Sequence, residues 1–401
     1  MRILWINCRI LFPLDTGGKI RTYNILKQLA KNHEIIYLTF SQDLDDRKNI
    51  LEMEKTVDSL ITIPWRESEK FSSKFYLEVI KNLLSKYPYV VKKYFSPNMK
   101  NKVNEIVGME NIDLIVCDFL FPTINIPGNI RRPKILFEHN VESTIWERHF
   151  KKQSNLLLKL YLFLQLKKLL RYEKETVNKY DHCIVVSELD KERIRNNFGK
   201  REVSVVPTGV DTDYFKPTAC SKKAYNIVFT GSMDWLPNED GIIYFVDKIF
   251  PIIKKKVPQA NLSIVGRNPT EKVKKLEDSY KGVEVTGYVN DIRPFLDRSE
   301  IFIVPLRIGG GTRIKIFEAM AMQKPVISTT VGAEGLPVKH YENIIIADDP
   351  EVFAEETISL LQNEHIRDRI GSKGQELVVK NHSWINAAKE FERVIAGYYQ
   401  Y

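Results

Sequence analysis

The segment Ile301–Gly335 combines side chains and backbone groups suited to bind a phosphate. Three consecutive glycines at 309–311 precede Thr312, Arg313 and Lys315. Glycines allow backbone N–H groups to approach a ligand closely. Cations normally avoid the start of a helix, because the helix dipole already makes it positive, so two cations there indicate an anion among them. A phosphate or pyrophosphate would bind the free N–H groups and both side chains together.

Regular elements must position these groups. The apolar run 301–304 predicts a buried parallel strand that ends at Pro305. We expect Thr312 to cap a helix that ends near Gln323, with a further strand at 326–328. Strand, glycine loop, cationic helix start and strand together predict a nucleotide-phosphate site. The alternative is a surface unit of the same kind whose glycines bind nothing.

The same alternation of strands and helices runs through the whole chain and predicts an α/β fold with doubly wound parallel sheets. A loop at 16–18 and an amphipathic helix at 20–31 are expected after the first strand. Strands are expected at 3–6, 35–40, 114–117, 135–137 and 182–186, and then at 227–230, 261–265, 283–286, 301–304, 326–328 and 344–346.

A chain of 401 residues is too long for one ordinary hydrophobic core, so we expect two Rossmann-like domains. Strand character stops in the turn-rich segment 205–217, which predicts a first domain at 1–206 and a second at 207–383. The C-terminal helix at 384–401 is expected to pack back on the first domain. Two such domains would direct the carboxyl ends of both sheets at a central cleft, where open α/β sheets bind ligands.

The net charge of +9 is concentrated in two segments. Residues 66–102 contain nine Lys or Arg and three Glu, and residues 151–180 contain eight Lys or Arg and two Glu, so each segment has a balance of +6. Such a field favours a negative partner, an anionic membrane surface or a lipid phosphate. The alternative is a solvated basic face. Nucleic acid is disfavoured because no nucleic-acid-binding motif accompanies the charge.

The helix expected at 154–172 has two interpretations of its own. One arc is predicted to face the core, while the opposite half interleaves leucines with cations, a pattern typical of a membrane interface. The alternative is a packed helix whose lysines extend to water. The predicted core arc consists of Leu158, Tyr161, Leu162, Leu166, Leu169 and Tyr172, and the cations are Lys159, Lys167, Lys168 and Arg171.

Further features favour a cytoplasmic protein. The four cysteines are far apart, without a C-x-x-C pair, which is typical of a reducing compartment. The N-terminus enters a strand directly, so no signal peptide is expected. No uncharged apolar run reaches the roughly 18 residues that a spanning helix needs. Asp211 and Asp213 resemble a metal motif only superficially, because they lie in the interdomain segment, and no metal site is expected.

Seven motifs in order along nearly the whole chain resemble glycosyltransferase family 4, whose members have the GT-B fold. The resemblance implies a nucleotide-diphosphate sugar as donor, retention at the anomeric carbon, and no metal or other cofactor. The motifs are PLDTGGKIRTYN (13–24), EHNVES (138–143), VVSELDKERI (185–194), VPTGVDTDYF (206–215), TGSMDWLPNEDGIIYF (230–245), GYVNDIRPFL (287–296) and GGGTRIKIFEAMAMQKPVISTTVGAEGL (309–336).

The resemblance also implies site residues. Gly17 and Gly18 would lie near the donor sugar and phosphate, His139 would face the donor sugar, Glu318 would accept the ribose hydroxyls, and Asp291 would lie in the loop that holds the base. The first domain would serve the acceptor and the second the donor. The other implied donor-binding positions are Gly231, Gly310, Gly311 and Thr312, with Arg313 in the loop that meets the diphosphate.

The sequence departs from the family pattern in two places. Segment 231–238 lacks the arginine and lysine that many members carry there, and Gly310 occupies the position of a glutamate that contacts the sugar in many members. Arg313 and Lys315 are expected to supply the positive charge instead. The alternative for these two cations is a surface ion pair with nearby acids.

The chemistry would depend on stabilising a leaving nucleoside diphosphate, for which Arg313 and Lys315 are the predicted catalytic cations. No carboxylate pair suited to a double displacement is evident, which favours a front-face route in which a donor phosphate oxygen takes the acceptor proton. His139, the third predicted catalytic residue, would position the sugar rather than attack it. Glu138 is expected to be structural, bonding backbone at the end of a strand.

The predicted function is a retaining, metal-independent, hexosyltransferase-like glycosyltransferase that adds a sugar to a glycan or lipid-linked acceptor in surface polysaccharide or glycolipid biosynthesis. Two alternatives stay open. One is a GT-B partner protein that binds nucleotide sugar but catalyses weakly, and the other is a sugar-nucleotide epimerase. The expected location is the cytoplasm, with a peripheral position on the inner face of the cell membrane as the membrane interpretation of the basic segments.

Overall fold

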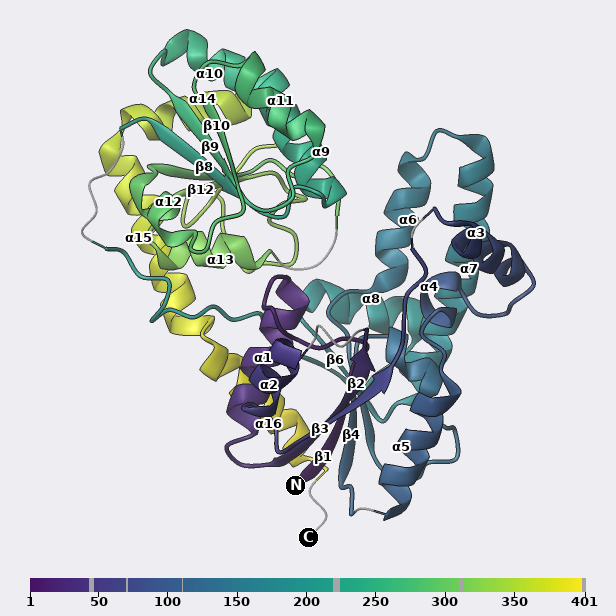
Figure 1. Ribbon diagram of the computed structural model, residues 1–401. Helices are drawn as coiled ribbons and strands as arrows, with labels where there is room; N and C mark the ends of the chain where they lie inside the picture. The colour runs from purple at the N-terminus through teal and green to yellow at the C-terminus, as the bar shows by residue number, and fades with distance from the viewer. Residues whose placement is uncertain (43–46, 70, 110, 219–223, 310–312, 399–401) are drawn as a thin grey trace. The chain divides into compact units, whose positions relative to one another are not determined.

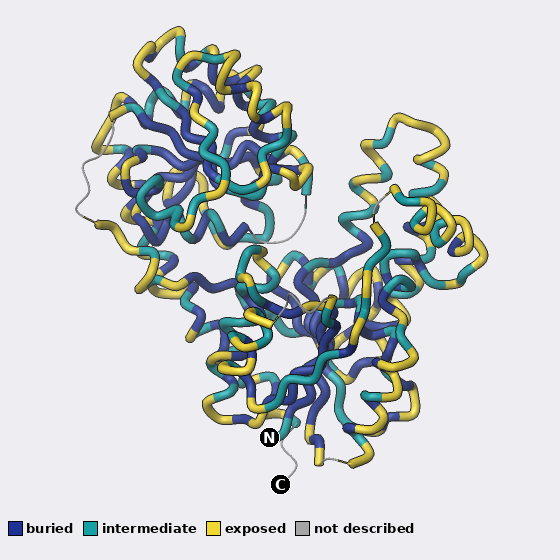
Figure 2. The backbone as a smooth tube through the Cα atoms, in the orientation of Figure 1, coloured by how far each residue is buried: buried dark blue, intermediate teal, exposed yellow. Residues whose placement is uncertain are grey.

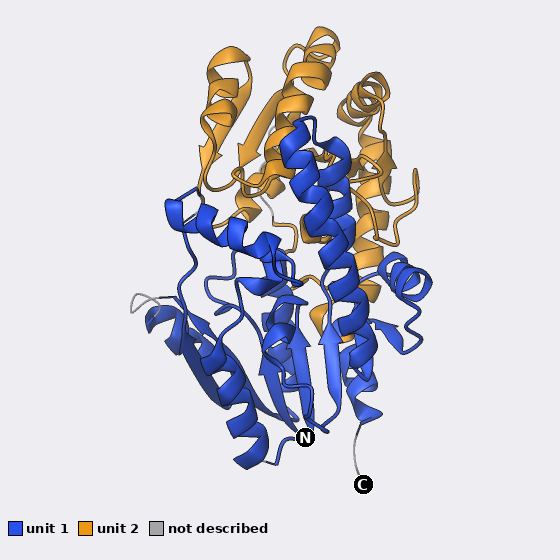
Figure 3. Ribbon diagram, turned by 90° about the vertical axis from the view of Figure 1, so that its right-hand side faces the viewer, with its two compact units in different colours: residues 1–207, 387–401 blue, residues 208–386 orange. Residues whose placement is uncertain are grey.

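The computed structural model describes residues 1–42, 47–69, 71–109, 111–218, 224–309 and 313–398. The chain forms two compact units, one of residues 1–207 with 387–401 and the other of residues 208–386 (Figure 3). Each unit contains a parallel sheet with helices on both faces (Figure 1).

The sheet of the first unit has seven parallel strands in the order β3-β2-β1-β4-β5-β6-β7. Strands β1 and β4 are neighbours, and the chain builds outward from them in both directions, so the switch point of this doubly wound sheet lies between them. The strands are β1 (Arg2–Ile6), β2 (Glu34–Ser41), β3 (Ser59–Pro64), β4 (Leu114–Asp118), β5 (Lys134–Phe137), β6 (His182–Val185) and β7 (Val203–Val205).

Helices cover both faces of this sheet, with α1, α2 and α16 on one side and α5 on the other (Figure 1). The helices of the unit are α1 (Gly17–Leu29), α2 (Arg47–Glu54), α3 (Ser73–Leu83), α4 (Tyr89–Lys92), α5 (Pro97–Met109), the 3-10 helix η2 (Phe121–Asn125), α6 (Glu142–Lys152), α7 (Leu156–Lys179), α8 (Glu188–Phe198) and α16 (Trp384–Ala396).

The second unit repeats the plan with six parallel strands in the order β10-β9-β8-β11-β12-β13, and its switch point lies between β8 and β11. The strands are β8 (Asn226–Thr230), β9 (Asn261–Val265), β10 (Val283–Gly287), β11 (Ile301–Val304), β12 (Val326–Ser328) and β13 (Ile345–Ile346). The helices are α9 (Leu236–Tyr244), the π-helix η3 (Phe245–Ile249), α10 (Phe250–Lys256), α11 (Glu271–Ser279), α12 (Arg293–Arg298), α13 (Ile314–Ala321), α14 (Pro350–Gln362) and α15 (Glu364–Asn381).

The predicted α/β class with parallel sheets is confirmed, and every predicted strand is present within one or two residues. Two strands were missed. Strand β3 is only half-buried along most of its length, and β7 has three residues, so neither gives a strong apolar pattern. The predicted loop at 16–18 is wrong, because Gly17 and Gly18 are the first residues of α1 and Thr16 precedes the helix. The predicted cap Thr312 lies outside the described residues, and α13 begins at Ile314 with Arg313 in the N-cap position.

The predicted core arc of α7 is confirmed only in its C-terminal part. Leu166 and Leu169 are buried, whereas Leu158 is 45% exposed. The first turns of α7 extend beyond the sheet and pair with α6, so they have no core to face (Figures 1 and 2).

The C-terminal helix α16 completes the core of the first unit. Its Phe391 is fully buried and stacks on Trp5 of β1, with ring centroids 5.4 Å apart. The same ring meets Phe137 of β5 edge-on, also at 5.4 Å. One aromatic side chain therefore joins the last helix of the chain to two strands of the N-terminal sheet.

We expect Phe391→Ala to lower the free energy of unfolding by about 3–5 kcal/mol, because it leaves a cavity against Trp5 and Phe137. A urea titration followed by circular dichroism measures this. The matched control is Phe71→Ala, which removes a ring that is 76% exposed and should change stability by less than about 0.5 kcal/mol. Equal effects of the two substitutions would contradict this account of α16.

Candidate functional site

A buried carboxylate, Asp118, lies at the carboxyl end of β4 in the first unit and is fully shielded from water. Its Oδ2 accepts hydrogen bonds from Trp5 Nε1 (3.1 Å), Asn7 Nδ2 (2.7 Å) and Thr22 Oγ1 (2.7 Å). Its Oδ1 lies 2.6 Å from His139 Nε2. Four donors from β1, α1 and the segment after β5 thus converge on one carboxylate, which satisfies a charge that would otherwise be costly to bury.

The contacts of His139 define its tautomer. Its Nδ1 lies 3.0 Å from Arg21 Nη1, and because a guanidinium only donates, Nδ1 must accept. The ring proton is therefore on Nε2 and is donated to Asp118. Burial lowers the pKa of His139 below its usual value, although the neighbouring carboxylate opposes the shift. The imidazole is consequently neutral near pH 7 and both of its nitrogens are engaged.

Arg21 brings a positive charge to the same place. It is 4% exposed, and burial lowers its pKa to about 10, with Asp118 opposing the shift, so it stays charged at neutral pH. It lies one turn into α1, the helix that Gly17 and Gly18 open.

The predicted residue Gly18 lies against His139. A Cβ at this position would be 2.7 Å from Phe119 Cζ and 3.7 Å from His139 Nδ1, so there is no room for a side chain. Phe119 stacks on the imidazole at 3.9 Å and has a φ of 74°, a backbone conformation that is strained for a phenylalanine. The structure therefore places Gly18 beside His139.

Glu138 does not have the structural role that the sequence analysis expected. Its side chain is 2% exposed, and neither carboxyl oxygen has a hydrogen-bond partner among the described residues. Burial raises the pKa of Glu138 well above its usual value, and the nearby Glu173 and Glu142 add to the shift. This environment favours the neutral form of the carboxyl group. Glu173 instead bonds the backbone, accepting from the amides of Glu142 and Ser143 at the start of α6.

Lys315 of the second unit reaches the carboxyl end of β8. Its Nζ donates to the carbonyl of Thr230, the last residue of β8, and to Asn238 Oδ1 at 3.0 Å. A Cβ on Gly231 would lie 2.9 Å from this Nζ, so glycine leaves the space that the ammonium group occupies. Burial lowers the pKa of Lys315 to about 7, and the charge of Arg313 adds to the shift while Glu318 opposes it.

Arg313 is 5% exposed and lies beside the first glycine of the triplet. Its Nη2 is 2.6 Å from the point where a Cβ of Gly309 would be, and its guanidinium lies 5.5 Å from the ring of Trp235. Glu318 is partly buried one turn after Lys315, and burial raises its pKa to about 7 while Lys315 opposes the shift. Arg313 and Lys315 are therefore not an exposed ion pair.

The remaining predicted residues of the second unit either lie apart from Arg313, Lys315 and Glu318 or fall outside the described residues. Asp291 is held by a different set of side chains, accepting from Arg293 Nη2 at 2.7 Å and from the hydroxyl of Tyr214 at 3.4 Å. The bond to Arg293 lowers the pKa of Asp291. Gly310, Gly311 and Thr312 lie outside the described residues.

Sequence reasoning missed several residues of both groups. Asp118 follows the apolar run LIVC, and a charged residue at the carboxyl end of a strand beside the switch point was an available signal. Arg21 is part of the GGKIRTY motif, but the sequence does not show that its side chain is buried. Asn238, which orients Lys315, gave no signal of its own.

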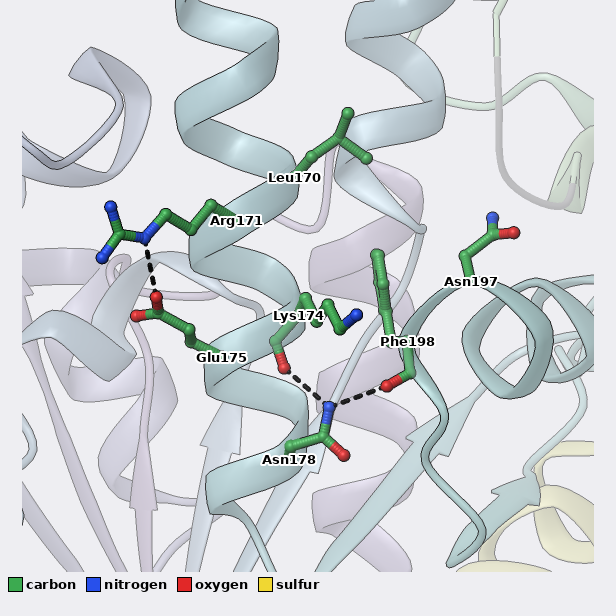
Figure 4. Close-up of a pocket in the computed structure, with 7 residues that line it drawn as sticks. All are labelled: Leu170, Arg171, Lys174, Glu175, Asn178, Asn197 and Phe198. Atoms are coloured by element: carbon green, nitrogen blue, oxygen red, sulfur yellow. Dashed lines mark hydrogen bonds and ion pairs between the residues drawn. The ribbon is translucent and has the colours of Figure 1, made fainter.

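Two further features lie outside these groups. A pocket between α7 and α8 contains none of the predicted catalytic or donor-binding residues. The Arg171–Glu175 ion pair lines it (Figure 4). Asp211 uses its Oδ1 to accept hydrogen bonds from the backbone amides of Asp213 and Tyr214, which stabilises a turn.

Within the described parts of the chain, no cluster of three or more His, Cys, Asp or Glu is suited to hold a metal ion. No helix there is long and apolar enough to cross a bilayer.

Comparisons with known proteins identify the families that match each part of the chain. A family model described as Glycosyltransferase Family 4 matches residues 16–214, and one described as Glycosyl transferases group 1 matches residues 224–363. An uncharacterized 44.6 kDa protein in the cps region of Klebsiella pneumoniae is 25% identical over 387 residues, which cover 90% of this chain and 91% of that protein.

Solved structures share the fold over the full length. Sucrose-phosphate synthase from Thermosynechococcus elongatus is similar with a TM-score of 0.73 at 15% identity, covering 99% of this chain and 98% of that one. HepE from Anabaena, in complex with UDP and glucose, is similar with a TM-score of 0.69 at 15% identity, covering 99% of both chains.

The two parallel-sheet units and these matches define a glycosyltransferase with the GT-B fold. The chain belongs to glycosyltransferase family 4, its second unit matching the group 1 transferase domain. The predicted family and fold class are thereby confirmed.

We expect His139 to remain a neutral imidazole with its proton on Nε2 at pH 6.5, because burial lowers its pKa and Arg21 blocks protonation at Nδ1. Nitrogen chemical shifts from NMR report the tautomer and charge, and His139→Gln assigns the resonance. An Nδ1-protonated or doubly protonated ring at that pH would contradict the assignment.

Proposed function

We propose that this glycosyltransferase uses a nucleotide-diphosphate sugar, works without a metal, and transfers a hexose-like sugar with retention to a glycan or lipid-linked acceptor. The observation that carries the proposal is the position of Lys315. Its ammonium group lies at the carboxyl end of β8, beside the switch point, where open α/β sheets bind their ligands. The UDP bound to HepE supports a nucleoside diphosphate as the anion.

Lys315 and Arg313 make an anion favourable at this place. Arg313 is buried and Lys315 is partly buried, and the charge of Arg313 contributes to the lowered pKa of Lys315. A diphosphate would relieve this repulsion and add the free amides at the start of α13. Glu318, one turn further along that helix, is the candidate acceptor for the ribose hydroxyls, as the family resemblance implies.

In the proposed step the bond between the anomeric carbon and the donor phosphate oxygen breaks, and its electron pair stays on the phosphate. The acceptor oxygen bonds to the same face of the anomeric carbon, and its proton passes to the phosphate oxygen. Negative charge grows on the leaving diphosphate, so preorganised cations lower the barrier. Arg313 and Lys315 are the proposed source of that stabilisation.

The first unit supports a front-face route rather than a double displacement. A double displacement needs a carboxylate nucleophile. Asp118 is enclosed by four donors, and burial raises the pKa of the Glu138 carboxyl group, which disfavours its charged form, so both are poorly suited to act as the nucleophile. His139 is neutral with both nitrogens engaged, which fits a positioning role, and Arg21 is its charged partner at the start of α1. We infer that the pair orients the transferred sugar.

The finer assignment is surface polysaccharide or glycolipid biosynthesis, with the protein in the cytoplasm and peripheral on the inner face of the cell membrane. The basic segments 66–102 and 151–180 support a lipid-linked acceptor. Two other functions remain as alternatives: a weakly catalytic partner that binds nucleotide sugar, and an epimerase. Incubating purified protein with nucleotide sugars and membrane lipid separates all three, because the partner transfers nothing and the epimerase needs no acceptor.

We expect Arg313→Ala to weaken binding of UDP far more than binding of uridine, because only the diphosphate meets the guanidinium. Transfer should fall on the order of 10²–10³-fold. Thermal-shift titrations and a transfer assay measure the two effects. The matched control is Arg307→Ala, which removes a guanidinium paired with Asp240 and 45% exposed at the side chain. An equal loss for UDP and uridine would remove Arg313 from the phosphate site.

The affinity for UDP should fall as the pH rises above 7. Burial lowers the pKa of Lys315 to about 7, and only its protonated form attracts the diphosphate. Above that pH, binding must also take up a proton, which weakens it by up to about tenfold per pH unit. Calorimetry between pH 7 and 9 measures the slope.

Two variants identify the titrating group. Lys315→Met should bind UDP weakly at every pH with little slope. Glu318→Gln should keep the slope, although burial also places the pKa of Glu318 at about 7. A steep slope in Lys315→Met would assign the titration to another group.

A further inference from the structure

The hairpin of α6 and α7 and the helix α3 lie beside one another in the first unit (Figure 1), and all three contain exposed stretches of chain (Figure 2). Large apolar side chains of α3 and α7 are exposed there. Leu156 and Leu157, at the start of α7, are 81% and 82% exposed, and Leu84, just after α3, is 96% exposed. We call the following residues the apolar face: Tyr76, Leu77, Ile80, Leu83 and Leu84 on and after α3, and Leu156, Leu157, Leu160, Phe163 and Leu164 on α7.

Hydrogen bonds join the two parts of the apolar face. Gln165 Nε2 of α7 donates to Asn82 Oδ1 of α3 at 3.0 Å. Lys168 Nζ donates to the carbonyls of Asn82 and Leu83 at 2.8 Å and 3.0 Å. Gln165 and Asn82 are buried, so these polar groups are used inside the structure and hold α3 against α7 while the leucines beside them face outward.

Two lysines around the apolar face lie close to aromatic rings. Lys167 Nζ lies 4.6 Å from the ring of Phe163, and Lys159 Nζ lies 5.5 Å from the ring of Phe150. Long lysine stems lie along apolar surface while their ammonium groups reach water or phosphate. The two segments that carry the apolar face are also the two with a balance of +6. Exposed leucines with lysines beside them suit the boundary of a bilayer, where the leucines can contact acyl chains and the lysines can contact anionic headgroups.

Charge favours an anionic bilayer as the occupant. The two segments that carry the apolar face have a balance of +6 each, and Leu156 and Leu157 are both more than four-fifths exposed. An inserted helix start would place these leucines among acyl chains while the lysines beside them reach the phosphate level.

We propose that the apolar face docks on an anionic lipid bilayer, with the leucines at the start of α7 and the end of α3 in the acyl boundary and the lysines at the phosphate level. The inference deepens the proposed function, on which it rests only for the idea that the acceptor is carried by the same membrane. The docking surface belongs entirely to the first unit.

Co-sedimentation of the full chain with vesicles tests the docking. Wild-type protein should bind vesicles of phosphatidylcholine with phosphatidylglycerol, bind pure phosphatidylcholine weakly, and dissociate as salt rises. The double variant Leu156→Ser, Leu157→Ser should lose binding by about tenfold or more. The matched control is Leu51→Ser with Val379→Ser, which removes two exposed apolar side chains elsewhere and should bind like wild type.

A second pair of variants tests the role of charge in the same vesicle assay. The double variant Lys159→Gln, Lys167→Gln removes two cations beside the apolar face, and the control Lys255→Gln, Lys275→Gln removes two cations of the second unit. Only the first pair should weaken binding to the anionic vesicles. Wild-type protein that ignores anionic vesicles, or serine variants that bind them as wild type does, would overturn the proposal. Concentration-dependent dimers that the leucine substitutions abolish, without vesicle binding, would assign the face to a second copy instead.

A thermal shift with UDP on the same variants separates this inference from the proposed function. The substituted leucines are exposed, and the substituted lysines are exposed or partly exposed, so folding and UDP binding should stay unchanged. Vesicle binding without any response to nucleotides would leave the docking intact and reject the proposed function. A UDP response without vesicle binding would do the reverse.

Discussion

The burial of the Asp118 carboxylate constrains the first unit more than any other interaction. A carboxylate withdrawn from water must be compensated by donors, and Asp118 takes them from Trp5, Asn7, Thr22 and His139. These groups come from β1, the residue after it, α1 and the segment after β5. The compensation therefore fixes where α1 begins and how the imidazole is turned. Phe391 of α16 packs behind Trp5, so the end of the chain supports the same point.

The second unit buries the opposite charge at the equivalent place. Beside the switch point of its sheet lie Lys315 and Arg313, with a carbonyl and an amide oxygen satisfying the lysine. A lysine whose pKa is lowered to about 7 next to a second cation is a group that an anion would stabilise. In the function that we propose, the imidazole and its arginine in the first unit orient the sugar, and the two cations of the second unit stabilise the leaving diphosphate.

The two ends of α7 have different surroundings. The C-terminal part of α7 is a core helix, with Leu169 buried and Glu173 holding the start of α6. Its N-terminal part leaves the sheet and exposes leucines that no element of the described unit covers. One helix therefore serves folding at one end and, by our inference, attachment to lipid at the other, so the acceptor and the catalytic unit would reach the same surface.

The sequence by itself determined the α/β class, nearly all strands, and the residue types of the proposed phosphate site, because hydrophobic period and glycine–cation spacing are local properties of the chain. It did not reveal Asp118 or Arg21 as partners of His139, which lie 21 and 118 positions away in the chain, because these side chains meet only when the parallel strands align. Nor did it show that the carboxyl group of Glu138 has no hydrogen-bond partner among the described residues, or that Leu158 lies outside the core. Burial depends on which elements pack together, and only the tertiary structure decided that.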